Sequence, residues 1–206
     1  MKIITAEQRS PEWFAARLGK ATGSRFCDVL AGGKGLTRKA YAVQLALEIV
    51  TGKAVEGFTS QAMQDGTERE PIARALFEAY SGHFVEEIGF CLHDTLPCGV
   101  SPDGLIDADG GLEIKCPKAS THASYLSMPA EPSAYTAQIQ GCMWVTGRQW
   151  WKFVSYHPDF PENAQLIVRH IKRDDAYIAR LEEAVKAFSK EVQAEVEMIR
   201  SFKNAA

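Results

Sequence analysis

The chain has 206 residues, a length typical of one domain. Its 46% hydrophobic and 24% charged residues are average for a globular protein, which excludes a disordered chain, a collagen-like repeat and a disulfide-dense scaffold. The sequence contains neither an apolar run of about 20 residues nor an apolar leader. We therefore expect no contact with a membrane and a cytoplasmic location.

Charge is distributed unevenly along the chain. The net charge of −3 argues against a uniformly basic surface for nucleic acid. Residues 1–53 nevertheless hold nine basic and four acidic side chains, a net charge of +5, so the remaining residues carry −8. A local basic groove is compatible with this balance, because phosphate binding depends on where lysines and arginines lie. The five cysteines lack metal-binding or redox spacing, and we expect reduced, mostly buried thiols.

The first third of the chain is expected to be helical. Ser10-Pro11-Glu12 has the residue types of a helix N-cap and first turn, and Gly19 would end this helix. A second helix should start near residues 22–24, followed by a loop over residues 31–35. Apolar spacing then predicts helices over residues 40–50 and 60–80.

The middle of the chain changes to short β-like runs. Residues 84–92, 99–101, 105–106 and 112–116 are separated by turn residues, which favours a β-meander. Helices are then expected over residues 121–127 and 133–145, strands over 150–156 and 165–170, and a long amphipathic helix over 174–202. The aromatic residues of the strand over 150–156 should pack in the core, namely Trp150, Trp151 and Phe153. This order predicts a single α/β or α+β domain over residues 1–206.

One predicted hairpin gathers acidic and basic side chains. In the strand over 112–116, the two-residue period places Glu113 and Lys115 on one face. Asp103 lies at a turn ten residues before Glu113, and Asp109-Gly110-Gly111 would let the chain fold back beside it. Two neighbouring carboxylates repel each other, so a divalent cation between them, Mg²⁺ or Mn²⁺, would stabilise the pair. Lys115 could then orient an attacking water or stabilise developing charge.

An Asp followed about ten residues later by Glu-x-Lys is common in protein sequences. This spacing by itself is more often explained by an exposed hairpin with an ion pair between the Glu and the Lys. The neighbouring residues, however, resemble the Pro-Asp … Asp/Glu-x-Lys nuclease superfamily and, within it, the phage lambda exonuclease family of viral-type recombination exonucleases. The resemblance runs from about residue 13 to 146 in five blocks: Trp13-x-x-x-Arg17-Leu18-Gly19-x-x-Thr22-x-Ser24, Gly66-x-x-x-Glu70-x-x-Ala73-Arg74-x-Leu76-Phe77-Glu78, Ser101-Pro102-Asp103-Gly104-Leu105, Gly111-Leu112-Glu113-Ile114-Lys115-Cys116-Pro117, and Ala134-Tyr135-x-Ala137-Gln138-x-Gln140-x-x-Met143-Trp144-Val145-Thr146.

The resemblance implies a restriction-endonuclease-like α/β core, with a mixed central sheet flanked by helices. It implies a Mg²⁺-dependent exonuclease that degrades one strand of linear duplex DNA from its 5′ end, releases 5′-mononucleotides and leaves 3′ single-stranded tails. By motif position, Asp103 and Glu113 would be metal ligands together with the backbone carbonyl of Ile114, and Glu70 would complete the acidic cluster. Lys115 would act on the attacking water.

The resemblance also implies a pocket for the terminal 5′-phosphate. Arg17 is the candidate cation, since its planar fork pairs with two phosphate oxygens; Ser24, Ser101 and Gln138 would donate further hydrogen bonds. Trp13, one helical turn before Arg17, would either stack on a base or anchor the first helix from a buried position. Three further basic side chains are candidate contacts to the DNA backbone, namely Lys34, Arg38 and Lys39.

The family suggests a ring-shaped homotrimer and, as a partner for the 3′ tail, a single-strand annealing protein from the same phage or prophage. Two alternatives remain. One is another nuclease of the superfamily, such as a structure-specific or restriction-type endonuclease, and the other is a catalytically silent DNA-binding scaffold. The intact Asp103, Glu113 and Lys115 argue against the scaffold. Arg17 and Ser24 argue against the endonuclease, which has no need to bind a terminus.

Overall fold

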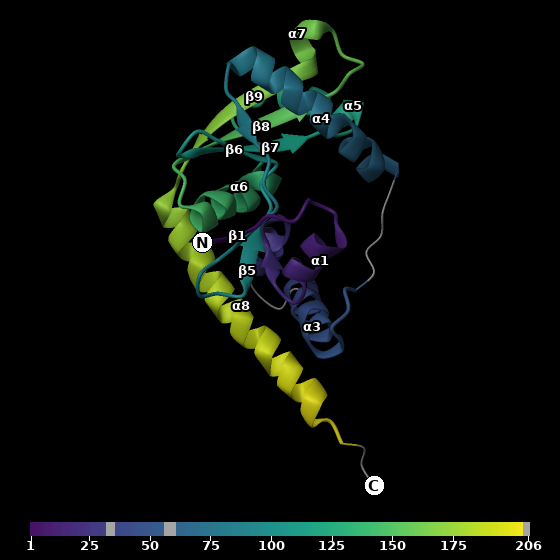
Figure 1. Ribbon diagram of the computed structural model, residues 1–206, viewed down its shortest axis with the longest axis vertical. Helices are drawn as coiled ribbons and strands as arrows, with labels where there is room; N and C mark the ends of the chain where they lie inside the picture. Colours follow the sequence, from purple (N-terminus) through teal and green to yellow (C-terminus); the bar gives the residue numbers. More distant parts are fainter. Residues whose placement is uncertain (32–35, 56–60, 204–206) are drawn as a thin grey trace.

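A computed structural model describes residues 1–31, 36–55 and 61–203 (Figure 1). Within these residues the strands form two sheets, one of four strands in the order β1-β4-β5-β2 and one of five in the order β3-β6-β7-β8-β9. Helices surround both sheets, so the predicted mixed α/β class with flanking helices is confirmed.

The four-stranded sheet carries the N-terminal helices. Its strands are β1 (Lys2–Ile4), β4 (Phe90–Leu92), β5 (Cys98–Val100) and β2 (Ala21–Thr22), and only the β2–β5 pair among them is parallel. The helical segments are α1 (Pro11–Arg17), the 3-10 turn η1 (Gly23–Arg25), α2 (Phe26–Leu30) and α3 (Leu36–Thr51). The Ser10 side chain caps α1 by accepting a hydrogen bond from the Trp13 amide, as its sequence predicted.

The five-stranded sheet contains the predicted hairpin at its centre. Its strands are β3 (Val85–Glu86), β6 (Gly104–Ile106), β7 (Gly110–Lys115), β8 (Trp150–Tyr156) and β9 (Leu166–Lys172). β7 and β8 are parallel and are joined through α5 (Ala119–Leu126) and α6 (Ser133–Thr146), whereas the other pairs in this sheet are antiparallel. A short helix, α7 (Glu162–Gln165), precedes β9.

The two faces of this sheet are covered by different helices. On one face, Leu112 and Ile114 of β7 pack with Phe77 of α4 (Gln61–Ser81). On the other face, Trp151 and Phe153 of β8 belong to the main core with residues of α6 and α8. Because side chains alternate along a strand, Glu113 is turned away from α4 and toward α6.

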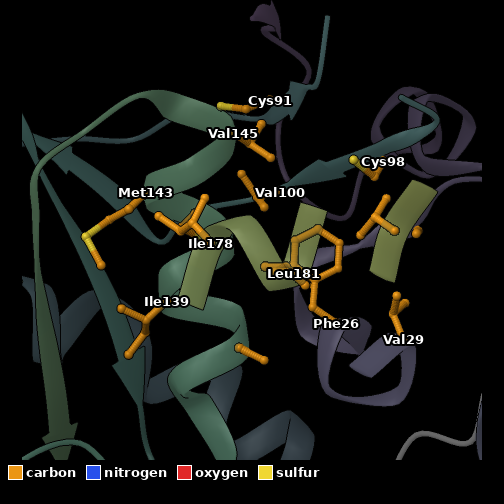
Figure 2. Packing of buried hydrophobic residues seen from close by; sticks show 14 of the residues in the cluster. Phe26, Val29, Cys91, Cys98, Val100, Ile139, Met143, Val145, Ile178 and Leu181 are labelled. Carbon is orange, nitrogen blue, oxygen red and sulfur yellow. The ribbon is translucent and has the colours of Figure 1, made fainter. Parts of the chain in front are cut away.

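The main core joins the two sheets through α6 and α8 (Asp175–Ser201) (Figure 2). Leu181 of α8 and Phe26 of α2 meet there, and Gly141 of α6 allows the close approach, since a Cβ at this position would lie 2.3 Å from the Phe26 ring. Asp174 caps α8 through the Tyr177 amide, and the C-terminal turns of α8 extend beyond the rest of the fold (Figure 1). Trp151 and Phe153 are fully buried, which confirms their predicted core position.

The structure corrects several element boundaries. The predicted single run over residues 84–92 is two strands, β3 and β4, that belong to different sheets. The chain crosses between the sheets at Gly89, where a Cβ would lie 2.3 Å from the carbonyl oxygens of Ile4 and Ala6. β1 was not predicted, and α3 begins at Leu36 instead of residue 40.

The structure also bears on the predictions for the cysteines and for membrane-spanning helices. All five thiols are free; Cys91, Cys98 and Cys142 are buried, whereas Cys27 is exposed. Over residues 1–31, 36–55 and 61–203, no helix has both the length and the apolar character required to span a bilayer.

Candidate active site

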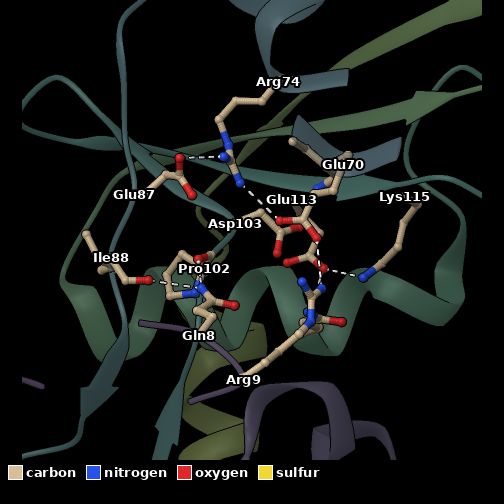
Figure 3. A network of polar contacts seen from close by, with 12 residues as sticks. Gln8, Arg9, Glu70, Arg74, Glu87, Ile88, Pro102, Asp103, Glu113 and Lys115 are labelled. Carbon is tan, nitrogen blue, oxygen red and sulfur yellow. Dashed lines mark hydrogen bonds and ion pairs between the residues drawn. The ribbon is translucent and has the colours of Figure 1, made fainter. Parts of the chain in front are cut away.

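Asp103 and Glu113 lie beside each other on the β6–β7 hairpin. In this antiparallel pair Gly104 is opposite Leu112, so Asp103, directly before β6, is opposite Glu113. Asp103 Oδ2 accepts a hydrogen bond of 2.6 Å from the Ile114 amide. Figure 3 shows the two carboxyl groups pointing into one region. The hairpin thus brings together the two acids that the sequence suggested would meet.

Lys115 lies on the same face as Glu113, as the strand period predicted. Its ammonium group forms an ion pair with Glu113 Oε1. The same nitrogen is 5.1 Å from the centre of the Tyr135 ring, so a cation–π contact supports it from α6. The lysine is therefore held between a carboxylate and an aromatic ring.

The environment of the site raises the pKa values of Asp103, Glu113 and Lys115. Burial raises the pKa of Asp103 well above its usual range, and the neighbouring Glu113 charge raises it further. Burial also raises the pKa of Glu113, although Lys115 opposes this shift. For Lys115, burial alone would lower the pKa, but the Glu113 and Asp103 carboxylates outweigh it and the net shift is upward. Lys115 is consequently a stable cation beside two carboxyl groups that repel each other.

The arrangement of Asp103 and Glu113 fits a divalent cation. Glu113 is fully buried, and its Oε2 has no hydrogen-bond partner among the residues that the structure describes. A buried, unpaired carboxylate oxygen is unfavourable unless a cation or a proton compensates it. Hard oxygen ligands of this kind are those that Mg²⁺ and Mn²⁺ prefer. Ile114, whose carbonyl was the third expected ligand, lines the adjoining cavity of about 460 Å³ together with Lys115 and Glu70.

Glu70 approaches the pair from α4 but is bound to two arginines. Its Oε1 is 3.0 Å from Arg74 and its Oε2 is 3.1 Å from Arg9. Arg74 also forms an ion pair of 2.6 Å with Glu87. Within the described part of the chain, no three His, Cys, Asp or Glu side chains are close enough together to hold a metal ion. Both carboxylate oxygens of Glu70 are thus paired with arginines in this arrangement, and its role as a third ligand stays a prediction.

Gln138 contacts the acidic pair. Its Nε2 donates a hydrogen bond of 2.6 Å from α6 to Glu113 Oε1, the oxygen that Lys115 also contacts. The family resemblance had assigned Gln138 to the terminal phosphate. The observed contact links it to a candidate metal ligand, on the face of the sheet that α6 covers, and its contact with a phosphate stays a prediction.

Arg17, Trp13 and Ser101 form a second polar cluster. The Arg17 guanidinium lies 3.9 Å from the centre of the Trp13 ring and donates a hydrogen bond of 3.1 Å to Ser101 Oγ. Trp13 Nε1 donates to the same oxygen at 2.9 Å. Burial lowers the pKa of Arg17 to about 10, while Tyr41 and Glu48 oppose this shift. A partly buried arginine bound to neutral groups is suited to bind an anion.

Trp13 and Ser24, two further residues predicted to contact the DNA, differ in exposure. Trp13 is only 8% exposed, which favours its anchoring role over stacking on a base. Ser24 is exposed in η1, next to Gly23, which packs so closely on Val100 that a Cβ would be 3.0 Å from its side chain. Since Ser101 follows Val100, the strand brings the Ser24 turn and Ser101 to the same end of the sheet.

The candidate DNA-backbone contacts differ in their surroundings. Lys34 lies outside the described residues. Arg38 is bound to Glu191 of α8, at 2.8 Å, and to the Val29 carbonyl, so it joins α3 to α8. Lys39 is exposed on α3.

Sequence reasoning missed three side chains at the acidic site. Arg74 could have been found from its i, i+4 spacing to Glu70 on a predicted helix. Tyr135 lies one helical turn before Gln138, so it shares the α6 face that meets β7. Arg9 offers no such signal, because it precedes the first helix and contacts residues of α4 that are remote in sequence.

Comparison with known proteins identifies the family. Residues 12–149 match the YqaJ-like viral recombinase domain, which is two thirds of the chain. The chain belongs to this family. The match covers all five motif blocks, and it confirms the predicted relationship to viral-type recombination exonucleases.

Solved structures with the same fold are exonucleases. An alkaline exonuclease from Laribacter hongkongensis, LHK-Exo, is 42% identical with a TM-score of 0.87, over 93% of this chain and 96% of that one. Its complex with dAMP aligns with a TM-score of 0.88 at the same identity and coverage. A phage-related exonuclease from Haemophilus somnus shares the fold at 16% identity, with a TM-score of 0.71 over 87% of this chain and 96% of that one.

A sequence relative is known from Escherichia coli K12. Its ExoD protein is 40% identical over 57 residues, which represent 27% of this chain and 63% of ExoD. Together, these matches identify this YqaJ-family chain as an exodeoxyribonuclease by family and fold. This is the enzyme class that its sequence predicted.

Proposed function

We propose that this protein is a Mg²⁺-dependent exonuclease that hydrolyses one strand of linear duplex DNA from its 5′ end. The observation that carries the proposal is the pair Asp103 and Glu113, in which the buried Glu113 has one oxygen without a hydrogen-bond partner among the described residues and Lys115 lies alongside. The pair fits a divalent cation, and phosphodiester hydrolysis is the chemistry for which nucleases of this family use one.

In this mechanism Asp103 and Glu113, with the Ile114 carbonyl, would hold the cation. When bound, Mg²⁺ would polarise the scissile phosphate and lower the pKa of the attacking water. Gln138 would fix the Glu113 carboxylate through its 2.6 Å hydrogen bond. Lys115 would remain protonated, because the two carboxylates raise its pKa. It would therefore orient the water and stabilise the charge that develops on the phosphate, instead of removing a proton.

The 5′ polarity rests on the cluster of Arg17, Trp13 and Ser101. We infer that the partly buried Arg17 guanidinium binds a terminal phosphate, with hydrogen bonds from Ser101 and Ser24. Ser101 and Asp103 are two residues apart, and two residues of extended chain span at most about 7 Å. A phosphate held at Ser101 would therefore lie about one nucleotide from the bond at Asp103, which favours release of one mononucleotide per cut.

The proposal also covers the reaction products, the partner protein and the oligomeric state. The structure of LHK-Exo with dAMP, a mononucleotide, supports mononucleotides as products here as well. Cleavage from 5′ ends would leave 3′ single-stranded tails, the substrate of a phage single-strand annealing protein. A homotrimeric ring around the duplex would keep the enzyme on its substrate. Light scattering after size-exclusion chromatography measures that assembly directly.

One cleavage experiment tests the proposal. Linear duplexes with either 5′-phosphate or 5′-hydroxyl ends, and a closed circular duplex, are incubated with the protein and Mg²⁺ and sampled over time. We expect 5′-mononucleotides from the linear substrates, faster from phosphorylated ends, and no cleavage of the circle. Asp103→Asn serves as the control for a contaminating nuclease.

The other outcomes support the alternative functions. Cutting of the circle would indicate an endonuclease of the same superfamily. An absence of cleavage with Mg²⁺ and with Mn²⁺, despite DNA binding, would indicate a catalytically silent scaffold.

A further inference from the structure

Arg9 has a strained backbone. Its φ is +72°, in the left-handed region that non-glycine residues rarely occupy. The residues on either side explain how this conformation is maintained. Gln8 Nε2 donates to the carbonyl oxygens of Ile88 and Pro102, at 2.9 and 2.8 Å, and Ser10 caps α1. The chain is thus fixed on both sides of Arg9, and a glycine would fit this position without strain.

The ion pair with Glu70 does not account for an arginine at this position. Glu70 is already bound to Arg74, whose side chain is 11% exposed, whereas the Arg9 side chain is 52% exposed. Exposed ion pairs contribute little to folding stability, and less than a left-handed backbone typically costs. Folding alone would therefore be served better by glycine, which indicates that the Arg9 side chain has another role.

The location of Arg9 indicates what that role is. Arg9 and Glu70 line both of the adjoining cavities, of about 300 and 460 Å³. Asp103 lines the first of these cavities and Lys115 the second. In Figure 3 the Arg9 side chain reaches from the loop before α1 toward the acidic cluster. A DNA strand positioned for cleavage at Asp103 would pass within reach of this guanidinium.

We propose that Arg9 binds a backbone phosphate of the DNA strand in the cleft, and that it exchanges Glu70 for this phosphate when DNA enters. This inference rests on the proposed nuclease function. Glu70 retains Arg74 after the exchange, so no carboxylate is left without a partner. The planar guanidinium is suited to both oxyanions, since each presents two oxygen atoms to it.

Three variants test the proposal. Arg9→Gly removes the side chain and relieves the strain of the left-handed backbone, whereas Arg9→Lys keeps the charge. As a control, Arg180→Ala removes an exposed arginine on α8 that does not line the cleft. Affinity for a short 5′-phosphorylated duplex is measured in EDTA, where cleavage is absent, at several salt concentrations. Melting temperature and the KM and kcat for Mg²⁺-dependent cleavage are measured on the same preparations.

We expect Arg9→Gly to melt at or above the wild-type temperature, yet to bind DNA more weakly and to have a several-fold higher KM. Loss of one phosphate contact should reduce the slope of log K against log salt concentration by about 0.9. Arg9→Lys should restore this slope, and Arg180→Ala should match the wild type in slope and KM.

Two results would overturn the proposal. If Arg9→Gly melts higher while its salt slope and KM equal those of the wild type, Arg9 is not a phosphate ligand. If only kcat falls, Arg9 acts through Glu70 instead of contacting DNA. Failure of the wild-type protein to cleave DNA would contradict the proposed nuclease function itself, and is distinguishable because all variants would share it.

Discussion

Gln138 Nε2 and Glu113 Oε1 are 2.6 Å apart, and this hydrogen bond ties α6 to the central strand of the candidate active site. The bond orients one carboxylate oxygen toward Gln138 and Lys115 and leaves the other, Oε2, without a partner in the described part of the chain. Glu113 is thereby arranged to offer a single buried oxygen to a cation. The contact places Gln138 beside a candidate metal ligand, whereas its role at the terminal phosphate, which the family resemblance implied, stays a prediction.

Gln138→Ala should therefore affect the chemical step and leave recognition of the DNA end unchanged. A hydrogen bond to a charged group contributes about 1.5–3 kcal/mol, which corresponds to a roughly 10–100-fold lower kcat. The preference for 5′-phosphorylated over 5′-hydroxyl ends should remain. Gln149→Ala, an exposed glutamine that bonds the Gly147 carbonyl, is the matched control. A lost end preference with unchanged kcat would place Gln138 in the phosphate pocket.

Lys115→Ala should prevent cleavage while DNA binding remains. The substitution removes the cation that we propose to stabilise developing charge, so kcat should fall at least roughly 10²–10³-fold. Single-turnover cleavage and binding in EDTA distinguish the two effects. Lys172→Ala, which removes an exposed lysine from β9, should leave both measurements at the wild-type level. Weaker DNA binding with normal cleavage at saturating DNA would show that Lys115 is only a substrate ligand.

Arg17→Ala should abolish the preference for phosphorylated 5′ ends. Hydrogen bonds to charged groups are each typically about 1.5–3 kcal/mol, so a roughly 10–100-fold preference would disappear. Arg17→Lys should retain part of it, because the charge remains but the planar fork is lost. Rates on 5′-phosphate and 5′-hydroxyl duplexes, measured in parallel, give the ratio. If the ratio for Arg17→Ala equals that of the wild type, the terminal phosphate binds elsewhere.

The hairpin with Asp103, Glu113 and Lys115 could be predicted from sequence because its geometry is local. Strand alternation places Glu113 and Lys115 on one face, and the turn over residues 107–109 brings Asp103 opposite Glu113. These relationships need only the strand period and a register. The motif blocks then supplied the family, since their joint order along the chain is specific.

The side chains that complete the site could not be predicted in the same way. The contact between Arg9 and Glu70 spans 61 residues, and it depends on how the loop before α1 packs beside α4. The two arginines that pair with Glu70 are likewise brought to it by packing, and the motif position of Glu70 does not indicate both of them. Similarly, the division of residues 84–92 between two sheets follows from close packing at Gly89, which strand propensity does not report.

Asp103→Asn should stabilise the protein in the absence of divalent ions and abolish its response to Mg²⁺. Burial and the Glu113 charge raise the pKa of Asp103, so the folded state binds its proton more tightly than the unfolded chain does. Stability contributed by this proton is present below the unfolded pKa and is lost as pH rises through the raised folded pKa. At pH 8, above the pKa of the unfolded state, Asp103 therefore destabilises the ion-free protein, and the neutral asparagine does not.

The melting temperature, followed with EDTA and with Mg²⁺ between pH 5 and pH 8, measures both effects. A stability difference of about 1 kcal/mol shifts it by about 2–4 °C in a chain of this size. We expect Mg²⁺ to raise the wild-type value, more at pH 8 than at pH 5, because the cation competes with protons for the same carboxylates. Asp159→Asn, at an exposed aspartate, should behave as the wild type does. Equal Mg²⁺ responses of the wild type and Asp103→Asn would show that the cation binds at a different site.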